Sequence, residues 1–324
     1  MFSELYCAPM EGVTRALFRQ QHHALFGGCD QYFTPFLAPS ADGIFSEKEL
    51  REVRPEACAG VPTVPQLLAA RPEHFLWAAK LMGDMGYRQV DLNLGCPSGT
   101  VVAKHKGSGM LADPDALDRF FDEVFRGLPD GMTLSVKTRI GLEDRDNWPA
   151  LLAVFDRYPI GLLTVHPRLR RQFYKGKPDG EAFALALEQV RLPLCWNGDI
   201  FTPEDARLLK EHFPSVERVM LGRGLVANPA LARQLRGGAP LTGGELRQFH
   251  DGVLEGYCAC ILGEVNVLHK MKELWNYWAC LYPEDKKGVK ALRKSRDLAG
   301  YRRAAAAVLA AEPAPNAGFF PETF

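Results

Sequence analysis

Short apolar runs alternate with longer amphipathic stretches over the first two thirds of the chain. The apolar runs predict strands at residues 4–8, 30–36, 62–67, 89–94, 132–138, 160–166, 192–197 and 217–222. Between them, the stretches 72–86 and 114–127 begin at a proline and end at a glycine, as helices do. Eight such strand–helix repeats in about 235 residues predict a closed parallel (β/α)8 TIM barrel. An open doubly wound sheet is the alternative, although no GxGxxG motif follows the first predicted strand.

The sequence changes character after residue 236. Residues 237–240 (GGAP) are typical of a linker, and the chain beyond them is rich in helix-forming residues and has no strand-like run. We therefore expect a catalytic barrel over 1–236 and a small helical domain over 241–311. Its predicted helices lie near 244–262, 266–280, 287–297 and 299–311. Residues 312–324 are broken by prolines and predict an irregular tail.

Composition and charge narrow the class of protein. The chain has 324 residues with 39 Lys and Arg against 39 Asp and Glu, which excludes a surface that is basic throughout. No apolar run approaches the ~18 residues of a membrane span. The first residues, Met1-Phe2-Ser3-Glu4, lack the pattern of a signal peptide. The eight cysteines show no zinc-like CxxC pair. We expect a cytoplasmic protein with reduced thiols, without a metal site and without an obligate protein partner.

Polar residues and glycines follow nearly every predicted strand. Because the carboxyl ends of barrel strands form one face, these residues are expected to converge on a single mouth. The residues are Pro9, Met10, Gln66, Asn93, Cys96, Lys137, Arg139, His166, Arg168, Asn197, Gly198, Asp199, Gly222 and Arg223.

The loops after the last two predicted strands indicate a phosphate site. Barrels commonly bind phosphate there, and Gly198, Gly222 and Arg223 offer close backbone approach and a guanidinium. The alternative is that the two glycines only form tight turns.

Lys137 ends a strand that is expected to be buried, where an ammonium group needs a partner. One candidate partner is a flavin, whose anionic reduced form a cation would stabilise. The other is an ion pair with Asp91 or Asp199.

Gln66 and Asn197 can hydrogen-bond a ring system or act as satisfied core amides. His166 is either a donor to the ligand or a core histidine.

Cys96 lies in a loop between a strand and Pro97, followed by Lys104 and Lys106. A thiol has an ordinary pKa near 8.5 and can deliver a proton to carbon. Nearby cations would instead lower that pKa and favour a nucleophile. The sequence leaves both roles open.

Six motifs resemble those of the tRNA-dihydrouridine synthases, in order and at familiar spacing. They are APMEGVT at 8–14, DLNLGCPS at 91–98, SVKTRIG at 135–141, HPRLRRQFYKG at 166–176, NGDI at 197–200 and LGRGLVANP at 221–229. The resemblance implies an FMN-dependent enzyme that NADPH reduces and that converts specific uridines of tRNA to dihydrouridine. In that reaction, hydride passes from FMN N5 to C6 and Cys96 protonates C5.

The resemblance also implies residue roles. It implies that FMN is held by Pro9, Met10, Gln66, Lys137, His166, Asn197, Asp199, Gly222 and Arg223. It implies that Asn93, Arg139 and Arg168 face the substrate and that Lys104 or Lys106 contacts the nucleic acid.

Two basic segments are candidate tRNA contacts. Residues 168–177 include Arg168, Arg170 and Arg171, and contain no acidic residue. Residues 286–303 carry eight basic residues and are expected to form the basic face of a helical tRNA-binding domain; the alternative is a solvated helix face. Two other functions stay open at this point: an FMN-dependent reductase of a small free enone or pyrimidine, and an RNA-binding module without catalysis.

Overall fold

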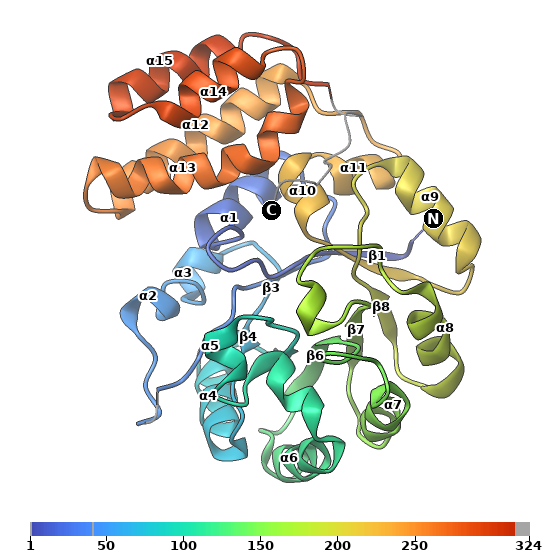
Figure 1. Cartoon of the computed structure of the whole chain (residues 1–324). Helices are drawn as coiled ribbons and strands as arrows, with labels where there is room; N and C mark the ends of the chain where they lie inside the picture. Colours follow the sequence, from blue (N-terminus) through green and yellow to red (C-terminus); the bar gives the residue numbers. More distant parts are fainter. Residues whose placement is uncertain (1, 41, 315–324) are drawn as a thin grey trace.

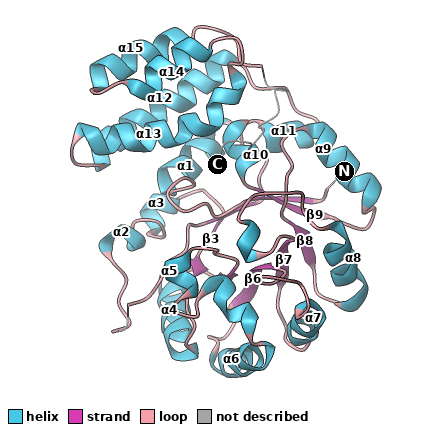
Figure 2. Cartoon of the chain, in the orientation of Figure 1, coloured by secondary structure: helices cyan, strands magenta, loops and turns pink. Residues whose placement is uncertain are grey.

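The computed structural model of the protein describes residues 2–40 and 42–314. In these residues, nine parallel strands are arranged in the order β3-β2-β1-β9-β8-β7-β6-β5-β4. The strands are β1 (Glu4–Cys7), β2 (Gln31–Phe33), β3 (Thr63–Val64), β4 (Gln66–Leu67), β5 (Gln89–Leu94), β6 (Thr133–Arg139), β7 (Leu162–His166), β8 (Leu194–Trp196) and β9 (Arg218–Leu221). They form the centre of the molecule, with helices around them (Figure 2).

The two end strands of this order, β3 and β4, are consecutive halves of the third predicted strand. Pro65 separates them because it has no N–H for the ladder. Leu37 fills the gap: its N–H donates to the Gln66 carbonyl (2.8 Å), and its own carbonyl accepts from Leu68 (2.8 Å). The sheet therefore forms a nearly closed barrel, and the predicted fold class is confirmed.

Helices surround the strands. They are α1 (Ala16–Leu25), α2 (Glu47–Leu50), α3 (Pro55–Cys58), α4 (Pro72–Asp84), α5 (Gly99–Val102), α6 (Pro114–Gly127), α7 (Trp148–Asp156), α8 (Gly180–Gln189), α9 (Pro203–His212), α10 (Arg223–Ala227) and α11 (Leu231–Leu235), with 3-10 turns at Gly107–Ala112 and Arg170–Gln172. Helix α6 shows why they form where the sequence predicts. The Asp113 side chain caps its first turn by accepting from the Ala116 N–H (3.0 Å). Leu117, Phe121 and Val124 then recur at helical spacing and are buried against the barrel.

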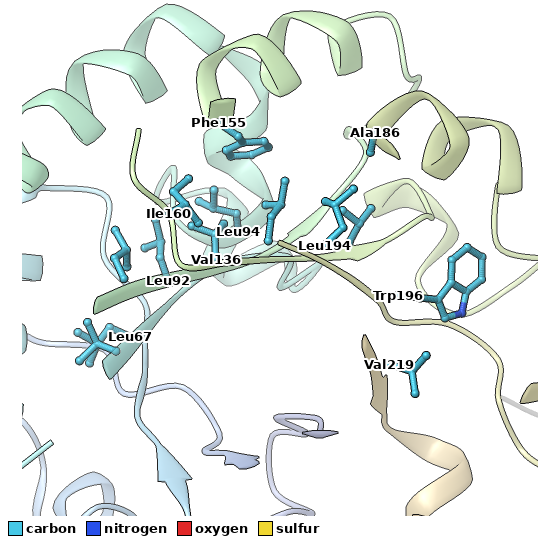
Figure 3. Packing of buried hydrophobic residues seen from close by; sticks show 14 of the residues in the cluster. Leu67, Leu92, Leu94, Val136, Phe155, Ile160, Ala186, Leu194, Trp196 and Val219 are labelled. Carbon is cyan, nitrogen blue, oxygen red and sulfur yellow. The ribbon is translucent and has the colours of Figure 1, made fainter. Parts of the chain in front are cut away.

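Alternation along the strands decides which side chains reach the barrel interior. On β5 and β6, the side chains of Leu92, Leu94 and Val136 belong to the hydrophobic layer beneath the outer helices (Figure 3). Successive strand residues point to opposite faces, so Asn93 and Lys137 point inward. Apolar side chains also fill the barrel interior: Tyr6, Ala8, Phe33, Val64, Leu162, Cys195 and Met220. The polar residues lie at the carboxyl ends of the strands.

Four helices follow the barrel, as predicted: α12 (Gly243–Cys260), α13 (Glu264–Trp278), α14 (Lys286–Lys294) and α15 (Leu298–Val308), with a 3-10 turn at Ala279–Leu281. They stack beside α1 and α10 (Figure 1). Phe18 of α1 meets Phe249 of α12 edge to face at 5.3 Å between ring centroids. The Trp278 indole N–H donates to the Val226 carbonyl (2.9 Å). One hydrophobic cluster thus spans both parts, and the predicted boundary at 236–241 stays a prediction.

Most of the predicted tail, residues 315–324, lies outside the described residues. Within the described part of the chain, no helix combines the length and apolar character that crossing a bilayer demands.

Candidate active site

A cleft of about 900 Å³, its open mouth included, lies at the carboxyl ends of the strands. It brings together fourteen of the predicted site residues: Pro9, Met10, Gln66, Asn93, Cys96, Lys137, Arg139, His166, Arg168, Asn197, Gly198, Asp199, Gly222 and Arg223. The remaining four, Lys104, Lys106, Arg170 and Arg171, are not among its lining residues. The convergence of strand ends on one mouth is therefore observed, whereas the role of each residue stays a prediction.

A chain of hydrogen bonds runs from the barrel interior to the Cys96 loop. Gln66 donates its Nε2 to a buried Asp91 carboxylate oxygen (2.7 Å). Asn93 donates its Nδ2 to Gln66 Oε1 (2.7 Å). The Asn93 Oδ1 then accepts from the Cys96 backbone N–H (2.8 Å). Asp91 thus fixes the orientation of both amides and, through them, the start of the Cys96 loop.

The same chain of hydrogen bonds determines which polar atoms remain for a ligand. Each amide spends one of its two N–H groups and its carbonyl oxygen on the protein, so Gln66 and Asn93 each keep one N–H. The Lys137 ammonium adds three more donors to the same cleft. This wall therefore suits a ligand edge that carries acceptors.

Burial raises the pKa of Asp91 to about 6, while hydrogen bonds from Gln66 and Ser135 and the charge of Lys137 act in the opposite direction. The Ser135 hydroxyl donates to the second carboxylate oxygen of Asp91 (2.7 Å). At neutral pH this carboxylate is ionised and fully buried.

Lys137 is the cation closest to this network. Burial and, to a lesser extent, the charge of Arg139 lower its pKa to about 8, and Asp91 partly counteracts them. Among residues 2–40 and 42–314, its Nζ has neither a hydrogen-bond nor an ion-pair partner. The ion pair with Asp91 or Asp199 that the sequence left open does not form in this part of the chain. A half-buried ammonium that lines the cleft without such a partner indicates a site for an electron-rich ligand.

Asp199 holds two guanidinium groups at the other end of the cleft. It is paired with Arg168, which is only 1% exposed, and with Arg223 (2.7 Å). Arg168 also lies 3.1 Å from His166 Nε2. Because a guanidinium only donates, Nε2 accepts, and the neutral ring carries its proton on Nδ1. Burial holds the pKa of His166 well below its usual range, and the cations around it lower that pKa further. This end is cationic and fits an anionic group.

The two glycines of the predicted phosphate site differ. A Cβ on Gly198 would lie 3.1 Å from both Pro178 and the Trp196 ring, so packing alone favours glycine there. A Cβ on Gly222 would meet Ala8 and Met10 only at 3.6 Å, which is ordinary contact. Close packing thus accounts for Gly198 but not for Gly222, and neither glycine has the positive φ that a turn would reserve for glycine.

Asn197 is partly committed to the scaffold. Its Nδ2 donates to the Met220 carbonyl on β9 (2.7 Å), which ties the end of β8 to the neighbouring strand. The amide keeps its oxygen and one N–H for a ligand.

Cys96 is half-buried at the cleft wall. Burial raises the pKa of its thiol, and the carboxylate of Glu11 adds to that effect, whereas Arg139 and Lys137 oppose it. The loop is held by the Ser108 hydroxyl, which donates to the Cys96 carbonyl (2.8 Å). A protonated thiol is therefore the form at neutral pH, and this favours the proton-donor role over the nucleophile role.

Arg139 and Arg168 reach the cleft, but their donors are largely used by the protein. Arg139 is 2% exposed and donates to the carbonyls of Gly95 (2.9 Å) and Leu169 (2.9 Å). Arg168 donates to the Gly176 carbonyl (2.6 Å) in addition to its bond with Asp199. Both guanidinium groups fix loops around the mouth, and direct contact with substrate stays a prediction.

Several residues that line the cleft were not predicted as site residues from the sequence, among them Glu11, Phe36 and Tyr174. The Tyr174 ring lies 4.9 Å from the Arg223 guanidinium, in cation–π geometry. Glu11 and Tyr174 both fall inside motifs, APMEGVT and HPRLRRQFYKG, that could have singled them out.

Comparison with solved structures reports on the fold. A variant of NCR from Zymomonas mobilis superimposes with a TM-score of 0.52 at 14% identity and covers 77% of this chain and 93% of its own. Histamine dehydrogenase from Rhizobium sp. 4-9 gives a TM-score of 0.56 at 11% identity over 84% of this chain and 49% of its own. At these identities, the likeness concerns the barrel alone.

Comparison at the sequence level goes further. The family model described as dihydrouridine synthase matches residues 6–275. A probable tRNA-dihydrouridine synthase of Rickettsia bellii is 31% identical over 264 residues, 80% of this chain and 79% of that protein. A tRNA-dihydrouridine(16) synthase of Pseudomonas putida is 31% identical over 238 residues, 72% and 73%. The resemblance seen in the motifs is confirmed, and the chain belongs to the dihydrouridine synthase family.

Proposed function

We propose that this enzyme reduces the C5=C6 bond of specific uridines in tRNA to dihydrouridine, with FMN as its flavin and NADPH as the reductant. The observation that carries the proposal is the meeting, in one cleft, of the protonated Cys96 thiol and the unpartnered Lys137 ammonium. Both are set among motifs of the family. The cytoplasm stays the predicted compartment.

The cleft residues fit a flavin mononucleotide. Lys137, with the free N–H groups of Gln66 and Asn93, matches the acceptor-rich edge of an isoalloxazine ring, and Asn197 offers both a donor and an acceptor. Arg223, which Asp199 holds in place, matches a phosphate. The remaining predicted flavin contacts are Pro9, Met10, His166, Gly198 and Gly222. When bound, FMN supplies hydride to C6 of the uracil ring.

Cys96 is the residue of this chain that supplies the proton for the reduction. The C4 carbonyl of uracil conjugates with C5=C6, so charge collects at C5 when C6 receives hydride. The raised pKa of the Cys96 thiol keeps its proton available at neutral pH. In the proposed reaction the thiol gives that proton to C5 and a proton from solvent restores it.

Exposed basic side chains offer contacts for the RNA phosphates. Lys286, Lys290 and Arg293 recur at i, i+4 and i+7 on α14 and are exposed. Other exposed candidates are Lys104 and Arg171. A reductase of a free pyrimidine would not need this surface.

The proposal is tested on the purified protein. We expect it to bind FMN, to lose the yellow colour with NADPH, and to recover it faster with unmodified tRNA than with tRNA that already carries dihydrouridine. Reoxidation by free uridine at the same rate, independent of salt, would instead establish the small-molecule reductase. A protein that cannot be loaded with FMN would refute the mechanism.

A matched variant tests the RNA surface. Lys286→Ala, Lys290→Ala and Arg293→Ala together should leave reduction by NADPH unchanged. They should weaken tRNA binding and reduce the slope of log affinity against log salt by up to about 3. An unchanged slope would identify α14 as an ordinary solvated helix face.

A further inference from the structure

Two adjacent aromatic side chains lie exposed in the loop after β7. Phe173 and Tyr174 are each 46% exposed, although buried side chains flank this loop in the fold. Tyr174 lines the cleft, whereas Phe173 is not among the lining residues. Neither the proposed reaction nor the packing of the barrel uses the Phe173 ring.

The backbone at Phe173 is strained. Its φ is 50° and its ψ is −96°, a conformation that a bulky residue rarely adopts and that glycine reaches easily. Among the described residues, only His105 shares a positive φ without being glycine. His105 lies between β5 and β6, after Cys96, so both positive-φ residues belong to segments that also supply cleft-lining residues, Cys96 and Tyr174. Strain of this kind persists where surrounding contacts impose it, and it clusters at functional sites.

Buried Arg139 holds the Phe173 backbone. Its Nη2 donates to the Phe173 carbonyl (2.7 Å), while its Nε donates to the carbonyl of Gly95, next to Cys96 (2.9 Å). Arg170 adds a second connection, because its Nε donates to the Pro97 carbonyl (3.3 Å) and its guanidinium lies 6.0 Å from the Phe173 ring centroid. The ring is thus held at a fixed place beside the Cys96 loop and directed to solvent.

We propose that Phe173 is a stacking platform for an unpaired tRNA base next to the uridine that enters the cleft. The inference rests on the proposed function. A uridine that leaves its stack to reach the cleft exposes the faces of its neighbours, and an aromatic side chain can cover one of them. Arg170 stands beside the ring, and the exposed Arg171 follows it in the chain, so both can meet flanking phosphates. Stacking on an aromatic ring tolerates any base, so the platform fixes the register of the strand and does not read its sequence.

The test uses the FMN-loaded enzyme and an unmodified tRNA transcript, with binding measured at several salt concentrations. Phe173→Ala should lower affinity about 5- to 100-fold without changing the salt slope, since stacking involves no counterion release. Phe173→Gly should lower affinity likewise while its melting temperature stays equal or rises, because glycine relieves the strain. Phe173→Trp should retain affinity. Leu208→Ala is the matched control, because Leu208 is 49% exposed on α9, away from the loop.

Each outcome decides the proposal. Unchanged affinity in Phe173→Ala and Phe173→Gly would overturn it, as would a loss accompanied by a smaller salt slope or a lower melting temperature. The last pattern would mean that Phe173 only orders the basic loop. The wild-type enzyme separates the two claims. If tRNA fails to reoxidise its reduced flavin, the proposed function is refuted. If reoxidation is normal but tRNA affinity does not change on substitution of Phe173, only the stacking platform is refuted.

Discussion

Replacing Asp91 with asparagine tests the electrostatics of the barrel interior. Burial raises the pKa of this carboxyl from its ordinary value of 3.8 to about 6, so the folded protein binds the proton more tightly than the unfolded chain does. The stability gained by protonation is complete below the ordinary pKa and is lost as pH rises through about 6. Between about pH 4.5 and 7.5, this one group costs the wild type about 2 kcal/mol of unfolding free energy.

Asp91→Asn keeps the shape and removes the titration. The new amide oxygen can accept from Gln66, and its NH2 can donate to the Ser135 hydroxyl, which is able to turn and accept. We therefore expect the unfolding free energy of the variant, relative to that of wild type, to increase by about 2 kcal/mol as pH rises over that range. A difference in stability that does not depend on pH does not affect this comparison.

The assay is urea unfolding of the flavin-free wild type and variant at several pH values. The difference between the two proteins cancels the titrating groups that do not interact with Asp91, and Lys137→Met in both backgrounds removes the one cation whose pKa depends on that carboxylate. Parallel stability curves would refute the reasoning, since they would mean that Lys137 and the two hydrogen bonds fully offset the burial of this carboxylate.

Three further substitutions test the cleft. Cys96→Ala should leave reduction of the flavin by NADPH intact and slow reoxidation by tRNA at least ~100-fold. In wild type, the raised thiol pKa predicts that reoxidation does not slow as pH rises through neutrality, and a decline already at neutral pH would contradict it. Lys137→Met should lower FMN affinity about 10- to 100-fold in a fluorescence titration and make the flavin potential more negative, and an unchanged potential would remove Lys137 from the ring edge. Asp199→Ala leaves Arg168 and Arg223 without their carboxylate and should lower the unfolding free energy, measured in urea, by about 2 to 3 kcal/mol. The loss is smaller than for a fully buried pair because Asp199 is 27% exposed. A loss near zero would show that the two guanidinium groups need no counterion.

The sequence predicted the barrel because its signals are local. Strand-like runs recur eight times, and the stretches 72–86 and 114–127 between them begin at a proline and end at a glycine. The same spacing places Gln66, Lys137 and Arg223 at strand ends. The break at Pro65 is a local feature whose consequence was missed, because the predicted strand 62–67 runs straight through it.

What the sequence could not predict depends on contacts across the barrel. Nothing local shows that Asp91 orients Gln66, residues far apart in the chain, or that Lys137 stands without an ion-pair partner. From the sequence, Asp91 was expected only as a possible ion-pair partner of that lysine. Its actual role follows from register: β4 places Gln66 beside Asp91, and alternation turns both inward.

Burial separates the roles of basic residues that look alike in sequence. The segment 168–177 predicts a phosphate-binding strip, yet Arg168 is buried against Asp199, and only neighbours such as Arg171 are exposed. A guanidinium that already satisfies buried carbonyls or carboxylates has little left for RNA, whereas an exposed one loses only counterions when it binds phosphate. The buried arginines therefore determine where the loop lies, and the exposed residues determine what it binds. This division is why substitution of Arg139 or Arg168 should disturb folding and flavin together, while substitution of Arg171 should change only the salt-dependent part of tRNA affinity.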